Sequence, residues 1–165
     1  NMKLKELINY LNIDKEKFIH IKKKVDLINS KTHADIKEIF SKINKEKVIL
    51  KIDIEGDEYK VLNEILNLSV QVESILVEFH GLEENRDKFL SMINEIQKTY
   101  FIIHLHANNI TGYCEDNLPK TIEMTFLKKN DLKLGLKKIN SYPIINLDYP
   151  NHPYIKDISI NFNEE

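Results

Sequence analysis

Glycine is scarce in this sequence, whose 165 residues include only Gly56, Gly81, Gly112 and Gly135. Their spacing permits neither a GxGxxG dinucleotide fingerprint nor a GxxxxGK phosphate-binding loop. A GxSxG nucleophile elbow is also missing from the sequence. The usual loop that cradles a dinucleotide or a nucleoside cofactor is therefore not encoded.

Cysteine, excess charge and long apolar runs are also lacking. The single cysteine, Cys114, excludes an internal disulfide and fits a reducing compartment. A formal net charge of −2 gives no electrostatic argument for nucleic acid or an anionic membrane as a partner. No apolar run reaches membrane-spanning length, and the first residues lack the h-region and cleavage site of a signal peptide. We therefore expect a soluble, cytoplasmic protein that binds neither nucleic acid nor a membrane.

Strands and helices alternate regularly from residue 47 onward. Period-two and continuous apolar runs predict strands over 48–54, 72–79, 100–106 and 121–127. Apolar stripes with helical spacing predict helices over 57–68 and 83–98. This order is typical of a parallel sheet with right-handed crossovers. Because no helical stripe separates the last two strands, we expect them to form an antiparallel pair that closes one edge of the sheet.

The whole chain, residues 1–165, is expected to form a single domain. Residues 1–46 are a helical and extended lead-in, with one helix over 4–11 and a second that follows a capping box at 32–35. Residues 47–130 are the α/β core. Residues 131–165 are an irregular wrap that holds three of the four prolines and a short edge strand near Ile158 and Ile160.

Polar side chains occur in pairs at the carboxyl ends of the three predicted parallel strands. The members of each pair lie two residues apart and so share a face of the strand: Asp53 and Glu55, Glu78 and His80, His104 and His106. Ligands bind outside the carboxyl ends of strands in open α/β sheets. Three such pairs in register predict a polar cleft, and Asn108 and Asn109 follow the third strand.

The residue types in this cleft suit two kinds of chemistry. Any of the three histidines could supply a general base, because the pKa of an imidazole lies near neutrality. Histidine, aspartate and glutamate are also suitable ligands for zinc, iron or manganese, but their spacing matches no compact ligand motif, and we assign no metal to the site. Gly56 allows a sharp turn and close approach of a ligand. Asp57 and Glu58 are interpreted as caps at the start of the next helix.

The segment KIDIEGDEYKVL, residues 51–62, resembles the signature of FkbM-type methyltransferases. The segments ILVEFHG, HLHANN, LPKTIEMTFL and LDYPNHPYIKDISINF follow it in the order expected for that family, so that the resemblance covers residues 47–165. It implies S-adenosylmethionine as the cofactor. It also implies transfer of a methyl group to a hydroxyl group of a sugar or a similar small molecule or glycan.

The resemblance further implies a fold and a set of site residues. The fold is part of a class I methyltransferase-like, Rossmann-like sheet of order 3-2-1-4-5-7-6, in which strand 48–54 is the fourth and the antiparallel strand 121–127 is the seventh. Asp53, Glu55 and Gly56 would line the methyl-transfer end of the cofactor pocket. The residues that would orient the acceptor and remove its proton are Asp53, Glu55, His80, His104 and His106. Those that would contact the acceptor are Glu78, Asn108 and Asn109.

The sequence departs from the family before its signature. Only 46 residues precede residue 47, where the resemblance begins, which is too few for three strand–helix units, and the glycine turn is missing. The chain therefore resembles the carboxyl-terminal half of the family. One alternative is a non-catalytic half-domain that pairs as a homodimer, or with a partner chain, through the exposed edge of strand 48–54, unless residues 18–28 cover that edge. A further alternative is a metal-dependent hydrolase that uses the same cleft.

Overall fold

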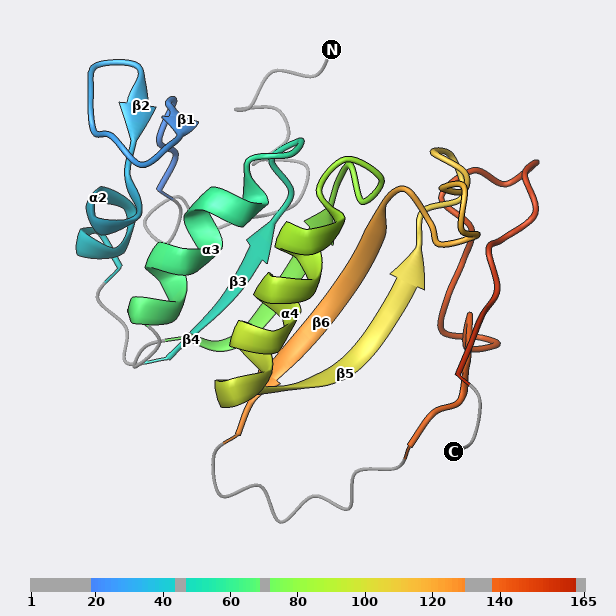
Figure 1. Ribbon diagram of the computed structural model, residues 1–165. Coiled ribbons are helices and arrows are strands. Elements are labelled where there is room, and N and C mark those ends of the chain that lie inside the picture. Colours follow the sequence, from blue (N-terminus) through green and yellow to red (C-terminus); the bar gives the residue numbers. More distant parts are fainter. Residues whose placement is uncertain (1–18, 44–46, 69–71, 130–137, 163–165) are drawn as a thin grey trace.

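A four-stranded mixed sheet lies at the centre of the computed structural model, which describes residues 19–43, 47–68, 72–129 and 138–162. The strands are β3 (Val48–Ile52), β4 (Val72–Phe79), β5 (Tyr100–Ala107) and β6 (Ile122–Lys128), and their order across the sheet is β3-β4-β6-β5. Figure 1 shows this sheet behind its two long helices. The helix expected over 4–11 lies outside the described residues.

The directions of the strands agree with the sequence prediction, but the place of β6 does not. β3 runs parallel to β4, and β6 runs antiparallel to both β4 and β5. The predicted antiparallel pair is therefore confirmed. However, β6 lies inside the sheet between β4 and β5, so the edge strand is β5. The FkbM resemblance predicts the same place for this strand. In its implied order, 3-2-1-4-5-7-6, the seventh strand is β6, and it lies between the fifth strand, β4, and the sixth strand, β5.

The two long helices cover one face of the sheet. They are α3 (Glu58–Asn67) and α4 (Arg86–Thr99), and Phe79 of β4 packs between them, with its ring 5.6 Å from Tyr59 and 5.2 Å from Phe89. α4 begins three residues later than predicted, because Gly81 adopts a left-handed φ of 61° and accepts a hydrogen bond from Asn85 in a preceding turn. The apolar stripes of both helices bury the core against the sheet.

The lead-in forms a small sheet of its own, and Ile36 and Phe40 of the helix that follows it join the hydrophobic core. β1 (Lys24–Val25) pairs in parallel with β2 (His33–Ala34), so residues 19–28 do not cover the edge of β3. The following helix α2 (Ile36–Ser41) is capped by Asp35, whose carboxylate accepts a hydrogen bond from the backbone of Glu38 at 2.7 Å. The predicted capping box with its cap at residue 32 is therefore wrong, because pairing of β2 keeps the chain extended up to residue 34.

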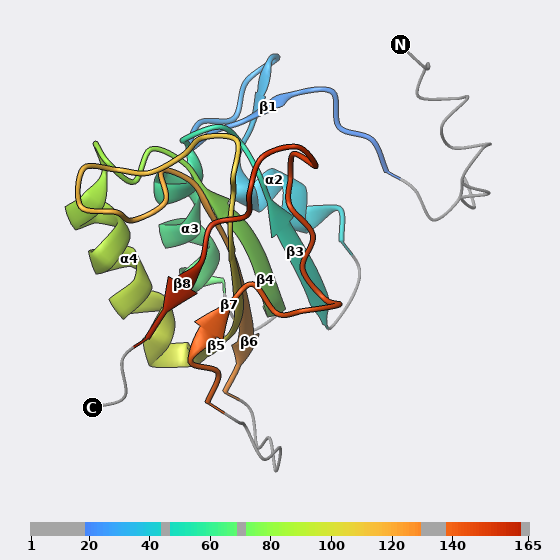
Figure 2. The same cartoon turned by 90° about the vertical axis from the view of Figure 1, so that its right-hand side faces the viewer.

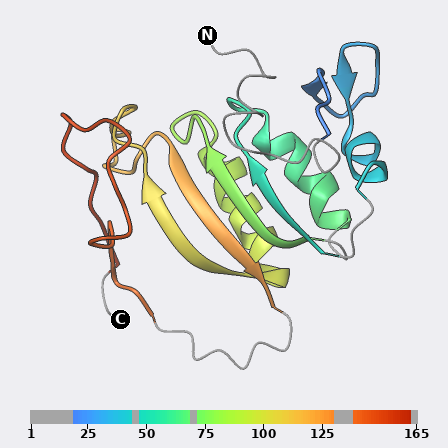
Figure 3. The same cartoon turned by 180° about the vertical axis from the view of Figure 1, so that it is seen from behind.

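The carboxyl-terminal residues 138–162 lie beside β5 (Figure 2). Here β7 (Ser141–Tyr142) pairs antiparallel with β8 (Ile160–Asn161), which corresponds to the short edge strand expected near residue 160. Figure 3 shows the sheet from behind, and the described residues place no helix on that face. The described helices are also too short or too polar to cross a membrane.

Candidate functional site

A sharp turn after β3 presents the first pair of candidate residues. β3 ends at Ile52, two residues earlier than predicted, and Asp53 lies beyond it. Glu55 and Gly56 then take left-handed backbone angles, with φ of 57° and 103°. Glycine tolerates such an angle and glutamate adopts it only at a cost of about 1–2 kcal/mol. The turn must therefore be stabilised by other contacts.

Glu58, the first residue of α3, provides these contacts. Its side chain is fully buried, and its carboxylate accepts hydrogen bonds from the backbone N–H groups of Ile54 at 3.2 Å and Gly56 at 3.0 Å. The same carboxylate lies 2.9 Å from Nδ1 of His80. Glu58 is thus more than the helix cap that the sequence suggested. One signal could have revealed this, because Glu58 lies on the apolar stripe of α3 with residues 61, 62 and 65.

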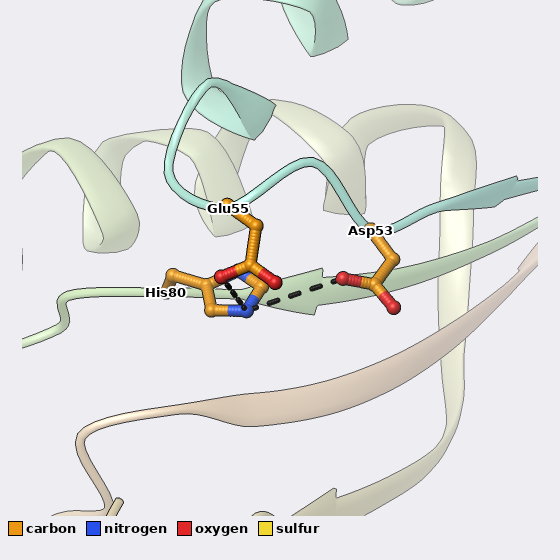
Figure 4. A group of neighbouring side chains, drawn as sticks. All are labelled: Asp53, Glu55 and His80. Atoms are coloured by element: carbon orange, nitrogen blue, oxygen red, sulfur yellow. Dashed lines mark ion pairs between the residues drawn. The ribbon is translucent and has the colours of Figure 1, made fainter. Parts of the chain in front are cut away.

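His80, which follows the last residue of β4, is held on two sides. The hydroxyl of Tyr59 donates to its backbone carbonyl at 2.9 Å, and the carboxylate of Glu58 accepts from Nδ1. These two contacts fix the ring and leave Nε2 without a hydrogen bond to Glu58. Nε2 then lies 4.0 Å from Asp53 Oδ1 and 3.7 Å from Glu55 Oε2 (Figure 4).

Glu78 extends the same cluster toward the neighbouring strands. It is 8% exposed, its Oε1 lies 3.9 Å from Nε2 of His80, and it accepts a hydrogen bond from Asn108 at 2.9 Å. Asn108 follows the end of β5, so its hydrogen bond to Glu78 links the end of β5 to the end of β4. The register also sets Glu78 directly opposite Glu123 of β6 on the same face.

The remaining candidates of β5 contact the carboxyl-terminal residues instead. Nε2 of His106 lies 3.0 Å from Asp157, and Nε2 of His104 lies 2.9 Å from Asp148, although the latter pair is not aligned for a hydrogen bond. Asn109 is buried and donates to two backbone carbonyls, those of residues 152 and 155. These three side chains hold the chain end beside β5.

The structure therefore divides the predicted cleft into two parts. We define the strand-end cluster as the set that converges around Nε2 of His80: Asp53, Glu55, Glu78 and His80. We define the tail clamp as the set that binds residues 138–162: His104, His106 and Asn109. Glu58 belongs to neither set, but it orients the histidine of the first.

Charges beside the turn are balanced by lysines. Hydrogen bonds from Lys60, at 2.7 Å, and then from Lys24, at 3.0 Å, lower the pKa of Asp57. Lys24 belongs to β1, so this contact joins the lead-in to the turn that carries the cluster. Burial, and then the charge of Glu58, raise the pKa of Tyr59 well above its ordinary value, which keeps its hydroxyl available as a donor to residue 80.

One comparison with known proteins gives a match. A family model described as the methyltransferase FkbM domain matches residues 9–106. The match begins in the lead-in, contains β3, α3, β4 and α4, and ends at His106 within β5. The two later segments that resemble the family in sequence, 118–127 and 147–162, lie outside it. Searches of curated proteins and of solved structures gave no match.

Proposed function

The chain belongs to the FkbM methyltransferase domain family, and we propose that its strand-end cluster is the acceptor-binding end of an S-adenosylmethionine-dependent O-methyltransferase site. The observation that carries the proposal is the orientation of His80. Its Nδ1 is engaged by a buried carboxylate, which leaves Nε2 facing Asp53 and Glu55. The side chains of these two residues are 40% and 86% exposed, so a solute can reach them.

Each side chain of the cluster has a distinct part in this proposal. The acceptor would be oriented by the carboxylates of Asp53 and Glu55, and its hydroxyl would donate a hydrogen bond to Nε2 of His80, which would take up the proton as the methyl group is transferred. A carboxylate behind the imidazole fixes the orientation of the ring, as in other histidine–carboxylate pairs. When bound, S-adenosylmethionine would supply the methyl group. The acceptor would be a sugar or another hydroxyl-bearing metabolite.

The described residues fit only one end of such a cofactor. Asp53, Glu55 and Gly56 could face its sulfonium, since carboxylates attract a positive charge. A Cβ at Gly56 would meet no atom within 4 Å, so this turn is open rather than closed around a nucleoside. The described residues therefore do not form a cradle for the adenosyl group. Residues outside the described ranges, or a second chain, would have to complete it.

The open edge of β3 favours a second candidate function. Among the described residues β3 pairs with β4 on one side and with no strand on the other. An uncovered edge can add a strand from another chain. In this alternative the chain is a non-catalytic half-domain that dimerises. Light scattering at several protein concentrations would then show a dimer whose dissociation constant is the same with and without the cofactor.

Methyl transfer from labelled S-adenosylmethionine to a panel of sugar and polyketide hydroxyls tests the first proposal. We expect transfer by the natural chain and a loss of at least about 100-fold in His80→Asn. The asparagine amide can still donate to Glu58, so the variant removes Nε2 without leaving a buried carboxylate unpaired. His33→Asn, in β2, serves as the matched control. Equal transfer by His80→Asn, or a dimeric chain that shows no calorimetric binding of the cofactor, would overturn the proposal.

A further inference from the structure

We infer that the strand-end cluster binds a divalent cation of the manganese type, with Asp53, Glu55 and His80 as ligands and Glu78 behind them. The binding site itself stands on the geometry and charge of the cluster. The use of the ion to activate an acceptor hydroxyl rests on the proposed function.

The spacing of the ligand atoms suits one ion. One carboxylate oxygen each from Asp53 and Glu55, together with a ring nitrogen of His80, lie within 4.8 Å of one another (Figure 4). Two ligand atoms that each lie about 2.1 Å from an ion are about 3–4 Å apart. The distances from Nε2 to the two carboxylates, 4.0 and 3.7 Å, are close to this range. They are also too long for direct hydrogen bonds, so these groups do not satisfy one another.

The orientation of the His80 ring agrees with a role as ligand. Glu58 accepts from Nδ1, so the proton of a neutral ring lies on that nitrogen and Nε2 carries a lone pair. Histidines that bind metals generally donate their other ring N–H to a carboxylate or a carbonyl in this way. The partner here is fully buried, whereas Nε2 faces the carboxylates of Asp53 and Glu55.

The balance of charge also calls for a cation. Four carboxylates surround this imidazole: those of Asp53, Glu55, Glu58 and Glu78. Glu58 and Glu78 are buried, and the hydrogen bond that Glu78 receives from Asn108 comes from a neutral amide. Nζ of Lys51 lies 3.8 Å from the carboxylate of Asp53, but the side chain of this lysine is 60% exposed. Hydrogen bonds offset part of the cost of burying these carboxylates, and a divalent cation would neutralise their remaining charge.

The ligand set indicates the kind of ion. One imidazole with two or three carboxylates is a mixed nitrogen and oxygen set, which suits manganese, iron or zinc better than the softer metals that thiolates select. Because the side chain of Glu55 is 86% exposed, part of the coordination sphere faces solvent. Water, or the hydroxyl oxygen of an acceptor, would occupy those positions.

A bound ion would acidify that hydroxyl. The O–H bond breaks, its electron pair stays on the oxygen beside the cation, and the proton passes to bulk water or buffer. A divalent ion can lower the pKa of a bound water by several units, and a bound alcohol follows the same electrostatic rule. In this form of the site His80 acts as a ligand, and the ion takes over the task of withdrawing the proton.

Titration of the metal-free chain with Mn²⁺, followed by electron paramagnetic resonance and by calorimetry, tests the site. We expect one ion per chain, and at least a tenfold loss of affinity in Asp53→Asn and in His80→Asn. Glu58→Gln, which removes the charge behind the ring, should weaken binding about 10- to 100-fold. Glu95→Gln, an exposed acid on α4, should bind as the natural chain does.

Several outcomes would overturn the inference: absence of stoichiometric binding by Mn²⁺, Mg²⁺ or Zn²⁺, or equal affinity in the cluster variants and the control. Circular dichroism of each variant shows whether it is folded, and Asp53→Asn is a mild change at a 40% exposed side chain. The two proposals fail separately. Methyl transfer that persists in the presence of a chelator would overturn the role of the ion and support the methyltransferase function. An ion bound by a chain that shows no methyl transfer would support the metal site and overturn the methyltransferase function.

Discussion

The strand-end cluster and the tail clamp begin from the same sequence pattern and reach opposite results. Each contains a histidine that follows an acidic or imidazole residue by two positions, at the carboxyl end of a strand. In the cluster, the carboxylate of Glu58 engages Nδ1 of His80 and leaves Nε2 open. In the clamp, the carboxylate of Asp157 engages Nε2 of His106 itself. The nitrogen that is occupied therefore decides whether an imidazole is free to bind a solute.

The two strand ends differ because the carboxylates that contact their histidines come from different parts of the chain. Glu58 lies in the helix that directly follows β3, so a short loop positions it behind the ring. Asp148 and Asp157 come from the chain end, which packs beside β5 and covers its two histidines. We therefore expect substitutions in the cluster to change binding and chemistry, and substitutions in the clamp to change stability and the order of the tail. Glu58 should affect both.

Replacing Glu58 should have the largest effect. Glu58→Leu removes the acceptor for the backbone N–H groups of residues 54 and 56 and for His80. Each buried donor that loses its acceptor costs about 1–3 kcal/mol, so we expect the free energy of unfolding to fall by about 3 kcal/mol or more. Urea denaturation followed by circular dichroism measures this change.

Glu95→Leu is the matched control, since Glu95 is exposed on α4 and should change stability by less than about 0.5 kcal/mol. If Glu58→Leu were as stable as this control, the turn after β3 would not depend on the buried carboxylate. The contrast between the two strand ends would then lose its physical basis.

The tail clamp should give the next largest effect, through Asn109. Its side chain exchanges three hydrogen bonds with backbone groups of residues 152 and 155. Asn109→Ala leaves these groups without their partner and should lower the free energy of unfolding by about 2 kcal/mol. Hydrogen exchange should become faster at residues 152–158 and stay unchanged at residues 54–58. Asn94→Ala, on the exposed face of α4, is the control, and equal exchange in both variants would contradict the assignment of Asn109 to the tail.

Much of the central sheet follows from local sequence patterns. Apolar runs and helical stripes predict β3, α3, β4, α4, β5 and β6, because side-chain periodicity reflects which face is buried. The absence of a helical stripe before β6 predicts its antiparallel direction. Its position between β4 and β5 cannot be read in that way, since the order of strands depends on contacts between distant segments. The family resemblance supplies that order, and the structure agrees with it.

The candidate site could be predicted only in part, for a similar reason. Asp53, Glu55 and His80 come together as predicted, because all three follow the ends of adjacent strands. Alternation within a strand is not the reason, since β3 ends at Ile52 and Glu55 lies in a left-handed turn. The positions of the strand ends do not predict the contact between His106 and Asp157, because these two residues lie 51 positions apart in the sequence. The position of Glu58 at a helix start predicts a cap, although its place on the buried stripe of α3 indicates a buried carboxylate.

The smallest effect should come from Asp57, which links the cluster's turn to the lead-in. Lys60 and Lys24 hold the pKa of this carboxyl below its ordinary value of 3.8. A group with a lowered pKa stabilises the folded state above its unfolded pKa, and that stabilisation is lost as the pH falls through the folded pKa. Because both lysines are exposed by more than half, we expect Asp57→Asn to cost only about 0.5 kcal/mol near pH 7.

The difference between Asp57→Asn and the natural chain should be constant from neutral pH down to about pH 4 and should shrink below it, as the carboxyl takes up its proton. Urea denaturation at several pH values measures this profile. Adding Lys24→Met to Asp57→Asn should cause no further loss, because the ion pair between β1 and the turn is already absent. A difference that stayed the same at about pH 2 would mean that Asp57 stabilises the turn through its shape rather than its charge. In that case the lead-in would contribute nothing electrostatic to the cluster, and the distinction between the two strand ends would rest on Glu58 alone.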